Sequence, residues 1–523
     1  MGIVSMGPAG AVGINTDLSP AELPPEAWSN GRNIQFASGA ANSVADTSVL
    51  VPVTPLQFNS AIPGPMAVSG YASWLLGGNT EVHAYIAGAL TEVTRASGDY
   101  TGASTNRWSG GALGGVTVLN NGADVPQGWA VASSSQLLTD LPNWPANTLA
   151  ACIRPYKQFL VALDITKGST RYPTLVKWSH PADPGTYPVT WDETDPTKDA
   201  GEYPLSETSG HCIDCVPLRD TNLIYKQDSV WSMQYIGGMY VFKFTKVFGD
   251  FGVPNRDCVV EYRSGKHFVF TGNDLLIHDG QNVQSIATGR VRKLLKTITV
   301  NQLRTAFVAL NPSAQEVWFC YRQASDDMIA ADTAIVYNWA DGSIGFRTLP
   351  NYRFIANGRL DPPITGIQTW DNVTGTWGDH PEEWGEAVIV PAVIRMVGLG
   401  ELTMEWLEAI PYSTSHCWVE RTYLGVPVKA GKAPDLSVQK FITRVWPRVV
   451  GTPGDVIRFR FGTADSVAKP IVWEQSQQYI IGVDEFLDCT LTGKMFAIRI
   501  ESENVNQWTF NGMDAEIIAS GAN

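Results

Sequence analysis

The strongest constraint on the fold is a dense series of short strand patterns between residues 211 and 286. Apolar, β-branched and aromatic residues recur there in short runs, separated by hairpin-sized connections such as Gly272-Asn273 and Asp279-Gly280. Two successive groups of four strands, of roughly 35–45 residues each, have the size of propeller blades. The expected strands are 213–217, 222–226, 229–236, 240–247, 258–262, 267–271, 274–278 and 282–286.

A third group of four strand patterns follows at 306–349. The sequence therefore predicts an all-β chain with a β-propeller-like body of antiparallel four-stranded units. We expect an extended N-terminal arm and docking segment over 1–60 and the propeller-like body over 61–360. A loop-rich accessory or tip region follows at 361–440, and an additional C-terminal β module at 441–523.

Two finer patterns support this division. The alternation of apolar and polar residues in 457–461 and 496–500 is typical of half-buried strands of the C-terminal module. The segment 290–304 places Val291, Leu294 and Leu295 on one helical stripe, so it predicts a connecting helix. Its Arg and Lys residues are expected on a solvated helix face.

The net charge of −14 limits the partners of the chain. An acidic surface repels phosphate, so tight or sequence-specific DNA binding is not expected. DNA as passing cargo is compatible with this charge, because a wall without phosphate-neutralising contacts lets DNA slide.

The seven cysteines are odd in number and widely spread, which favours reduced thiols made in a cytoplasm. Cys212 and Cys215 form a CxxC, but no second ligand pair follows at the spacing of a zinc site, so buried strand cysteines are expected. No cofactor and no metal ligand is therefore assigned. No secretory signal is recognised at the N-terminus, and no apolar run is long enough to span or insert into a membrane.

Acidic doublets are the candidates for a glycan-hydrolysing site, since such enzymes use two carboxyl groups facing each other across a cleft. They are Asp192/Glu193, Asp326/Asp327 and Glu382/Glu383. Adjacent residues on a strand point to opposite faces, so these doublets are poor pairs, and no catalytic residue is assigned. Pairing between carboxylates distant in sequence stays open.

Three tryptophans, Trp370, Trp377 and Trp384, fall seven residues apart in a stretch rich in turn-forming residues. Exposed tryptophans stack on sugar rings, so they are the candidate glycan-binding residues. The alternative is that they anchor irregular loops against a sheet or a neighbouring subunit, and we favour this packing role.

Several segments resemble the tail nozzle, or packaged-DNA stabilisation, proteins of short-tailed bacteriophages (the tail tubular protein B type). The run GINTDLSPAELPPEAWSNGRNIQF at 13–36 is the most specific, through its Leu23-Pro24-Pro25-Glu26-Ala27-Trp28 core and the following Asn30-Gly31-Arg32-Asn33. The segments 251–286, 369–377 and 493–500, with Trp508, are also similar to that family.

The resemblance implies a non-enzymatic structural virion protein of the tail, assembled in the host cytoplasm. It implies a homo-hexameric ring that continues the DNA channel, retains packaged double-stranded DNA and conducts it during ejection. The implied partners are the adaptor (head-to-tail connector) ring above and a tail fibre or spike, with a tail needle or tip protein as a further partner. Within it, Leu23, Pro24, Pro25, Trp28 and Arg32 are the expected partner-docking residues. The alternative function is a virion β-propeller tail protein that binds or degrades polysaccharide.

Overall fold

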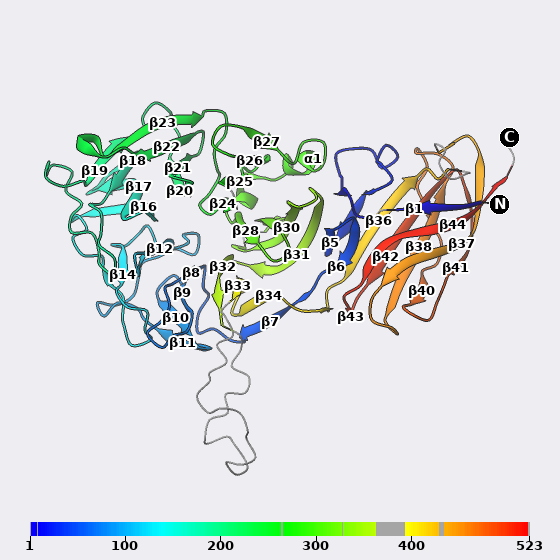
Figure 1. Cartoon of the computed structure of the whole chain (residues 1–523), viewed down its shortest axis with the longest axis horizontal. Helices are drawn as coiled ribbons and strands as arrows, with labels where there is room; N and C mark the ends of the chain where they lie inside the picture. Colours follow the sequence, from blue (N-terminus) through cyan, green and yellow to red (C-terminus); the bar gives the residue numbers. More distant parts are fainter. Residues whose placement is uncertain are drawn as a thin grey trace, which may run out of the picture. The chain divides into compact units, whose positions relative to one another are not determined.

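The computed structural model describes residues 2–7, 9–262, 265–326, 328–361, 393–427 and 434–520 (Figure 1). Strands dominate it, and the fold is all-β and β-propeller-like, as the sequence predicts. The chain divides into two compact units: unit 1 comprises 1–48, 253–352 and 406–523, and unit 2 comprises 49–252 and 353–405. In the described part of the chain, no helix is both long and apolar enough to cross a bilayer.

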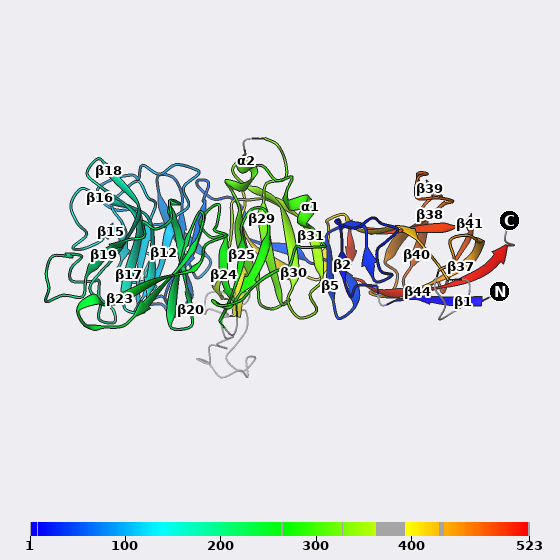
Figure 2. The same cartoon turned by 90° about the horizontal axis from the view of Figure 1, so that it is seen from above.

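Unit 2 is built from four-stranded antiparallel sheets whose strands follow each other along the chain (Figures 1 and 2). The strands of the first two sheets are β8 (Ser60–Pro63), β9 (Ser73–Gly77), β10 (Val82–Ile86), β11 (Ala89–Glu92), β12 (Ser109–Leu113), β13 (Val116–Asn120), β14 (Gln127–Trp129) and β15 (Thr139–Asp140). The next two hold β16 (Thr148–Tyr156), β17 (Phe159–Lys167), β18 (Thr170–Trp178), β19 (Gly201–Pro204), β20 (Cys212–Leu218), β21 (Thr221–Lys226), β22 (Val230–Tyr235) and β23 (Phe242–Phe248).

One further four-stranded sheet joins segments that are far apart in sequence. Its order is β32-β33-β34-β7, so an N-terminal strand forms one edge beside strands from the second half of the chain. The strands are β32 (Phe354–Leu360), β33 (Val393–Leu399), β34 (Met404–Ile410) and β7 (Asp46–Val51). The unit boundaries fall inside β7 and β34.

Unit 1 contains two further propeller-like sheets. They are formed by β24 (Val259–Tyr262), β25 (Lys266–Phe270), β26 (Leu275–His278) and β27 (Val283–Ser285), and by β28 (Phe307–Asn311), β29 (Glu316–Tyr321), β30 (Ala331–Asn338) and β31 (Ile344–Tyr352). The second of these sheets is extended by β2 (Gly13–Ile14) and β3 (Ala27–Trp28), which pair in parallel.

The rest of unit 1 is a module of two larger sheets. The first has the order β41-β37-β44-β6-β5, with β1 also paired to β44: β41 (Leu487–Gly493), β37 (Gln439–Val450), β44 (Thr509–Ser520), β6 (Ala40–Ser43), β5 (Ile34–Ala37) and β1 (Gly2–Met6). The second has the order β39-β38-β42-β36-β4, with β40 paired to β38: β39 (Val472–Trp473), β38 (Val456–Ala464), β42 (Met495–Ser502), β36 (Cys417–Leu424), β4 (Asn30–Arg32) and β40 (Gln477–Ile480). A short pair joins β35 (Tyr412–Ser413) to β43 (Val505–Asn506).

Hydrophobic alternation places the core of this module between its sheets. On β38, Ile457, Phe459 and Phe461 are buried while Arg458 and Arg460 are exposed, which confirms the period-two pattern. Phe459 lies 6.2 Å from Phe510 of the facing sheet, measured between ring centroids. Burial of these apolar side chains, not hydrogen bonding alone, holds the two sheets together.

The strand predictions for 211–286 and 306–349 are confirmed, since β20 to β31 each lie within about four residues of the expected positions. The single helix expected at 290–304 is wrong. Two one-turn helices form instead, α1 (Arg292–Leu295) and α2 (Val300–Leu303). In the described residues, the only other helical turn is η1 (Gly238–Tyr240). The Thr299 backbone N–H donates to Gln302 Oε1 at 2.8 Å, which starts a second helix at this point and interrupts the first.

The N-terminal segment is folded into unit 1. Its strands β2 to β6 join three different sheets there: the sheet of β31, the sheet of β36 and the sheet of β44. The described part of 361–440 also holds strands, β33 to β36. Trp370, Trp377 and Trp384 lie outside the described residues.

Candidate functional site

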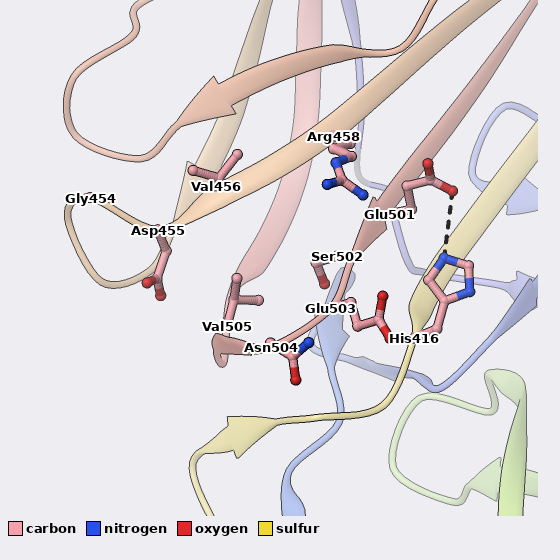
Figure 3. Close-up of a pocket in the computed structure, with 10 residues that line it drawn as sticks. All are labelled: His416, Gly454, Asp455, Val456, Arg458, Glu501, Ser502, Glu503, Asn504 and Val505. Atoms are coloured by element: carbon pink, nitrogen blue, oxygen red, sulfur yellow. Dashed lines mark ion pairs between the residues drawn. The ribbon is translucent and has the colours of Figure 1, made fainter.

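A polar hollow of about 410 Å³ opens at one end of the C-terminal module of unit 1 (Figure 3). Its walls come from the start of β38, the end of β42, the turn that follows and the residue that precedes β36. The lining side chains with polar groups are His416, Asp455, Arg458, Glu501, Ser502, Glu503 and Asn504. Asn504 has a φ of 56°, a conformation in which Asn is one of the better tolerated residues, and this sharp turn brings Glu503 to the rim.

The carboxylates of the hollow are held by neighbours. Glu501 accepts a hydrogen bond from Arg499 Nε at 3.0 Å, and its Oε2 lies 3.5 Å from His416 Nε2. Asp455 Oδ2 accepts the backbone N–H of Asn506 at 3.1 Å. Ser502 Oγ accepts the indole N–H of Trp508 at 2.7 Å. These contacts fix the floor of the hollow, and its rim presents Arg458 and Glu503 to solvent.

The chemistry of the hollow suits a ligand with several hydroxyl groups or a cationic group, because carboxylates are acceptors and three of them line it. A glycosidase pair needs one carboxyl that is protonated and one that is ionised. Glu501 is hydrogen-bonded to Arg499 and lies beside His416, and neither contact pairs it with a second carboxyl group. In the described residues, no group of three or more His, Cys, Asp or Glu side chains is arranged to hold a metal ion.

The expected docking residues lie between positions 23 and 32, in the N-terminal segment of unit 1. Leu23 and Trp28 are buried, Pro24 and Pro25 are exposed, and Arg32 is half-buried. The Trp28 indole N–H donates to the Ala9 carbonyl. Leu23 and Trp28 therefore serve the core of unit 1, and Pro24 and Pro25 are the expected docking residues that remain on the surface.

Arg32 connects the N-terminal segment to the sheet of β28 to β31. Its NH2 donates to Gln323 Oε1 at 2.5 Å, and its guanidinium carbon lies 5.9 Å from the centroid of the Phe346 ring. The next residue, Asn33, adopts a φ of 57° and donates from Nδ2 to the His416 carbonyl at 3.0 Å. The Asn-Gly-Arg-Asn sequence thus makes the turn by which the chain passes from one sheet of unit 1 to the next.

Sequence reasoning missed Arg421, the buried cation that holds this segment in place. It lies on β36, its NH2 donates to the Leu23 carbonyl at 2.8 Å, and its NH1 donates to the Pro20 carbonyl. Burial lowers the pKa of Arg421 to about 10. The strand pattern Cys-Trp-Val-Glu-Arg gave one usable signal, since Arg421 falls on the same face as the apolar Cys417 and Val419.

The CxxC cysteines are separate buried thiols. All seven cysteines are buried and outside any disulfide, and burial raises the pKa of both Cys212 and Cys215 to about 12. A β-bulge between Cys212 and Asp214 places both thiols in the apolar cluster of unit 2. Their environment stabilises the neutral thiol over the thiolate that binds metals.

The acidic doublets are not paired across a cleft where the structure describes them. Glu193 bonds the buried ammonium group of Lys177, and although burial alone would raise its pKa, this contact lowers the pKa of Glu193 to about 2. Asp326 pairs with Arg322, its Oδ2 lying 2.6 Å from NH2. Asp327, Glu382 and Glu383 lie outside the described residues.

Three of the four basic residues at the start of the 290–304 segment contact protein groups, and the fourth, Lys296, is exposed. Arg292 NH2 lies 3.4 Å from Asp274 Oδ2, and Lys293 Nζ donates to the Asp17 carbonyl oxygen. Arg290 donates to the Gly342 carbonyl. The Lys293–Asp17 contact ties the N-terminal segment to the connection between β27 and β28. The other two contacts tie that connection to the two propeller-like sheets of unit 1.

Comparisons with known proteins assign no family to this chain. No protein-family model matches the sequence, and no curated protein matches it. Among solved structures, one described as "YCF48 bound to D1 peptide" is similar over 72% of this chain and 97% of that chain, with 8% sequence identity and a TM-score of 0.37. At this level the similarity assigns neither a family nor a ligand to the chain.

Proposed function

We propose that the chain is a structural, non-enzymatic subunit of a short-tailed bacteriophage tail, a nozzle protein that assembles as a six-copy ring around the DNA path. The observation that carries the proposal is the resemblance of the 13–36 segment to that family. The proposal includes the adaptor ring above the nozzle, a fibre, spike or tip protein beside it, and double-stranded DNA as cargo.

The 13–36 segment, which carries the resemblance, makes several different contacts within unit 1. Trp28, Arg32 and Asn33 each make a bond or ring contact with a different part of unit 1.

Charge supports the proposed passage of DNA. The chain carries −14, and a ring of six acidic subunits would present few phosphate-neutralising contacts. Three basic residues of the 13–36 segment and of the 290–304 connection, Arg32, Arg290 and Lys293, are engaged with protein groups. Binding of linear duplex DNA to the purified chain is therefore expected to be weak at physiological salt.

The direct test is the location of the chain in particles. Virions carrying a tag after Asn523 would be purified and reconstructed by electron microscopy. The proposal expects tag density on the tail axis with six-fold multiplicity. Absence from the particle, or density only on peripheral spikes, would contradict it, and the second outcome would favour the glycan-directed alternative.

A variant pair tests the docking residues that are on the surface. Deleting 1–36 is unsuitable because it removes β1 to β4 and part of β5. Pro24→Ala with Pro25→Ala changes only exposed side chains, and Pro184→Ala, also exposed, is the matched control in unit 2. Loss of tail incorporation in the first variant and normal incorporation in the control are expected. Equal incorporation of both would remove 24 and 25 from the docking surface.

The polar hollow favours a second candidate function, a tail protein that binds or degrades polysaccharide, because hydroxyl groups of a ligand can donate to its carboxylate acceptors. Incubating the purified chain with host surface polysaccharide separates the two functions. The nozzle proposal expects no change in polymer length. Cleavage that disappears in Glu501→Gln would establish the alternative.

A further inference from the structure

Unit 2 presents loops without any charged residue at one end of its strands. The connections 64–72, 130–138 and 236–241 contain only apolar, small or uncharged polar residues. Each carries large apolar side chains that are exposed to solvent: Met66 and Val68, then Val131 and Leu137, then Ile236 and Tyr240. Val68 is 78% exposed and Tyr240 is 71% exposed, and the informative feature is that several such side chains occur in these three connections.

These connections share one end of the sheets in unit 2. Ser109 Oγ accepts the Ile153 N–H, and Gly111 faces Pro155, so β12 and β16 run in the same direction. The Arg154–Asp214 ion pair, together with the bond from the Tyr156 hydroxyl to the Asp220 carbonyl, establishes the same direction for β16 and β20.

The third strand of an antiparallel sheet runs parallel to the first, so the loops after β14 and β22 start at this same end. The Val68 N–H donates to the Ala132 carbonyl at 3.0 Å, which joins 64–72 to 130–138. Lys157 Nζ lies 5.8 Å from the centroid of the Tyr235 ring, which places the β16–β17 turn beside the 236–241 hairpin.

Several backbone donors at the two most exposed tips are satisfied within the loops. In the hairpin, the N–H groups of Ile236 and Gly237 both donate to the Val241 carbonyl, and the Val241 N–H donates to Gly238. In the first loop, Ala67 donates to Tyr71 and Gly70 donates to Ala67. A loop with internally bonded donors enters an apolar phase at lower cost than one whose donors need water.

Charged side chains lie next to these apolar tips, at the same end of the strands. Lys157, Arg219 and Lys243 are exposed at the base of the hairpin, accompanied by Asp220 and, farther along the same end, by Asp183 and Asp361. Tyrosine beside lysine is the pattern of side chains that sit at the headgroup level of a bilayer, with the apolar tip below them. The basic groups near the hairpin match the phosphates of that layer.

We propose that this end of unit 2 is a peripheral lipid-binding surface, whose tips at Val68 and Tyr240 enter the boundary between headgroups and acyl chains of a phospholipid bilayer. No segment crosses the bilayer in this mode; only side chains at the tips leave water. Insertion of apolar side chains drives the binding, and anionic headgroups strengthen it modestly through Lys157 and Lys243. The proposal does not depend on the nozzle function.

Vesicle flotation of the full chain tests this surface, with phosphatidylcholine vesicles and with vesicles containing phosphatidylglycerol. Wild type is expected to float with both. Val68→Ser and Tyr240→Ser, combined, should lower the partition coefficient by about tenfold or more, because each buried apolar side chain contributes on that scale. Circular dichroism and thermal melting would establish that the variant is folded.

Two matched controls carry the same kind of change elsewhere. Val53→Ser alters a valine that is 74% exposed in a different connection of unit 2, and Val300→Ser alters one that is 81% exposed on α2 of unit 1. Both should float like wild type. The proposal would be overturned if wild type did not float, or if all variants floated equally. It would also be overturned if the protein bound only anionic vesicles and the tip substitutions did not change that binding. If wild type formed an oligomer in solution and did not bind vesicles, and the tip variant no longer formed that oligomer, the surface would be a protein-docking surface. That result would also overturn the lipid-binding proposal.

Discussion

Arg154 and Asp214 form a two-point ion pair between the first strands of adjacent sheets in unit 2. Arg154 Nε lies 2.8 Å from Asp214 Oδ1, and NH2 lies 2.9 Å from Oδ2. The Asp214 side chain is 1% exposed, and Arg154 is the cation that its carboxylate contacts. A bidentate pair of this kind fixes the register of β16 against β20 as well as contributing energy.

Replacing Arg154 by Met should destabilise the protein strongly. The change keeps the length of the side chain but leaves the Asp214 carboxylate buried without its cation, which typically costs about 3–5 kcal/mol. The measurement is urea unfolding followed by fluorescence of the tryptophans in unit 2. Arg171→Met is the control, because its partner Asp164 is also buried but the Arg171 side chain is 54% exposed, and a smaller loss is expected. Equal losses would show that burial of the cation does not matter.

Replacing Arg421 by Met should loosen the N-terminal segment of unit 1. Arg421 supplies hydrogen bonds to the carbonyls of Pro20 and Leu23, and their loss inside the protein costs about 1–3 kcal/mol. Hydrogen exchange read by mass spectrometry should show faster exchange in 13–36 than in wild type. The exposed Arg458, on β38 of the same sheet, gives the control Arg458→Met, for which no change in that segment is expected. Unchanged exchange in Arg421→Met would refute this assignment.

Strand positions in 211–349 could be predicted because the period-two pattern and the turn residues act locally. The Asp279-Gly280 connection is an example: Gly280 adopts a φ of 89°, and the Asp279 carboxylate accepts the Gln281 and Asn282 N–H groups. The partners of β2 to β6 could not be predicted. Asn33 and His416 are 383 positions apart, and no local pattern encodes which distant strand a two- or three-residue strand will join.

The candidate site, the polar hollow of unit 1, could not be predicted from the sequence either. Its residues combine the start of one strand, the end of another and His416, and exposed polar residues at strand ends look alike in a sequence. The helix at 290–304 failed for a different reason. The apolar stripe was real, since Val291 and Leu295 are buried, but Thr297 and Thr299 interrupt the helix with β-branched residues and a new N-terminal cap.

Glu316 should make stability depend on pH in unit 1. Burial, and then the charge of Glu408, raise the pKa of Glu316 from 4.5 to about 7. Because the folded state favours the protonated acid, its stabilising contribution is complete below pH 4.5 and is lost as the pH rises from 4.5 to about 7. Glu316→Gln keeps the shape and stays neutral, so the free-energy difference between the variant and wild type should grow over this interval, by an amount on the order of 3 kcal/mol. Urea unfolding at pH 5 and pH 8 measures it. A difference that is the same at both values would contradict the protonated form.

His278 should make the stability of unit 1 fall as the pH is lowered, the opposite of the pH dependence expected from Glu316. Burial, and then the neighbouring His267, lower the pKa of His278 from 6.5 to about 3. The folded state favours the neutral ring, so its contribution is complete above pH 6.5 and is lost as the pH falls from 6.5 toward 3. His278→Gln, which cannot be protonated, should lose less stability than wild type between pH 6.5 and pH 4. Urea midpoints of both proteins at these two values test this. A parallel fall of the two midpoints would mean that other groups govern the acid response.

Cys212 and Cys215 should be unreactive until the chain unfolds. Both thiols are buried, and burial raises the pKa of each to about 12, so the thiolate that attacks alkylating reagents is scarce at pH 8. Iodoacetamide treatment of the native protein, followed by peptide mass mapping, should leave the peptide with these two residues unmodified, whereas treatment in urea should modify both. Chelation by EDTA should leave the melting temperature unchanged, because buried neutral thiols do not hold zinc. Rapid native alkylation, or a lower melting temperature with EDTA, would instead point to an accessible or metal-bound pair, and Cys212→Ser with Cys215→Ser would then distinguish a metal ligand from a packing role.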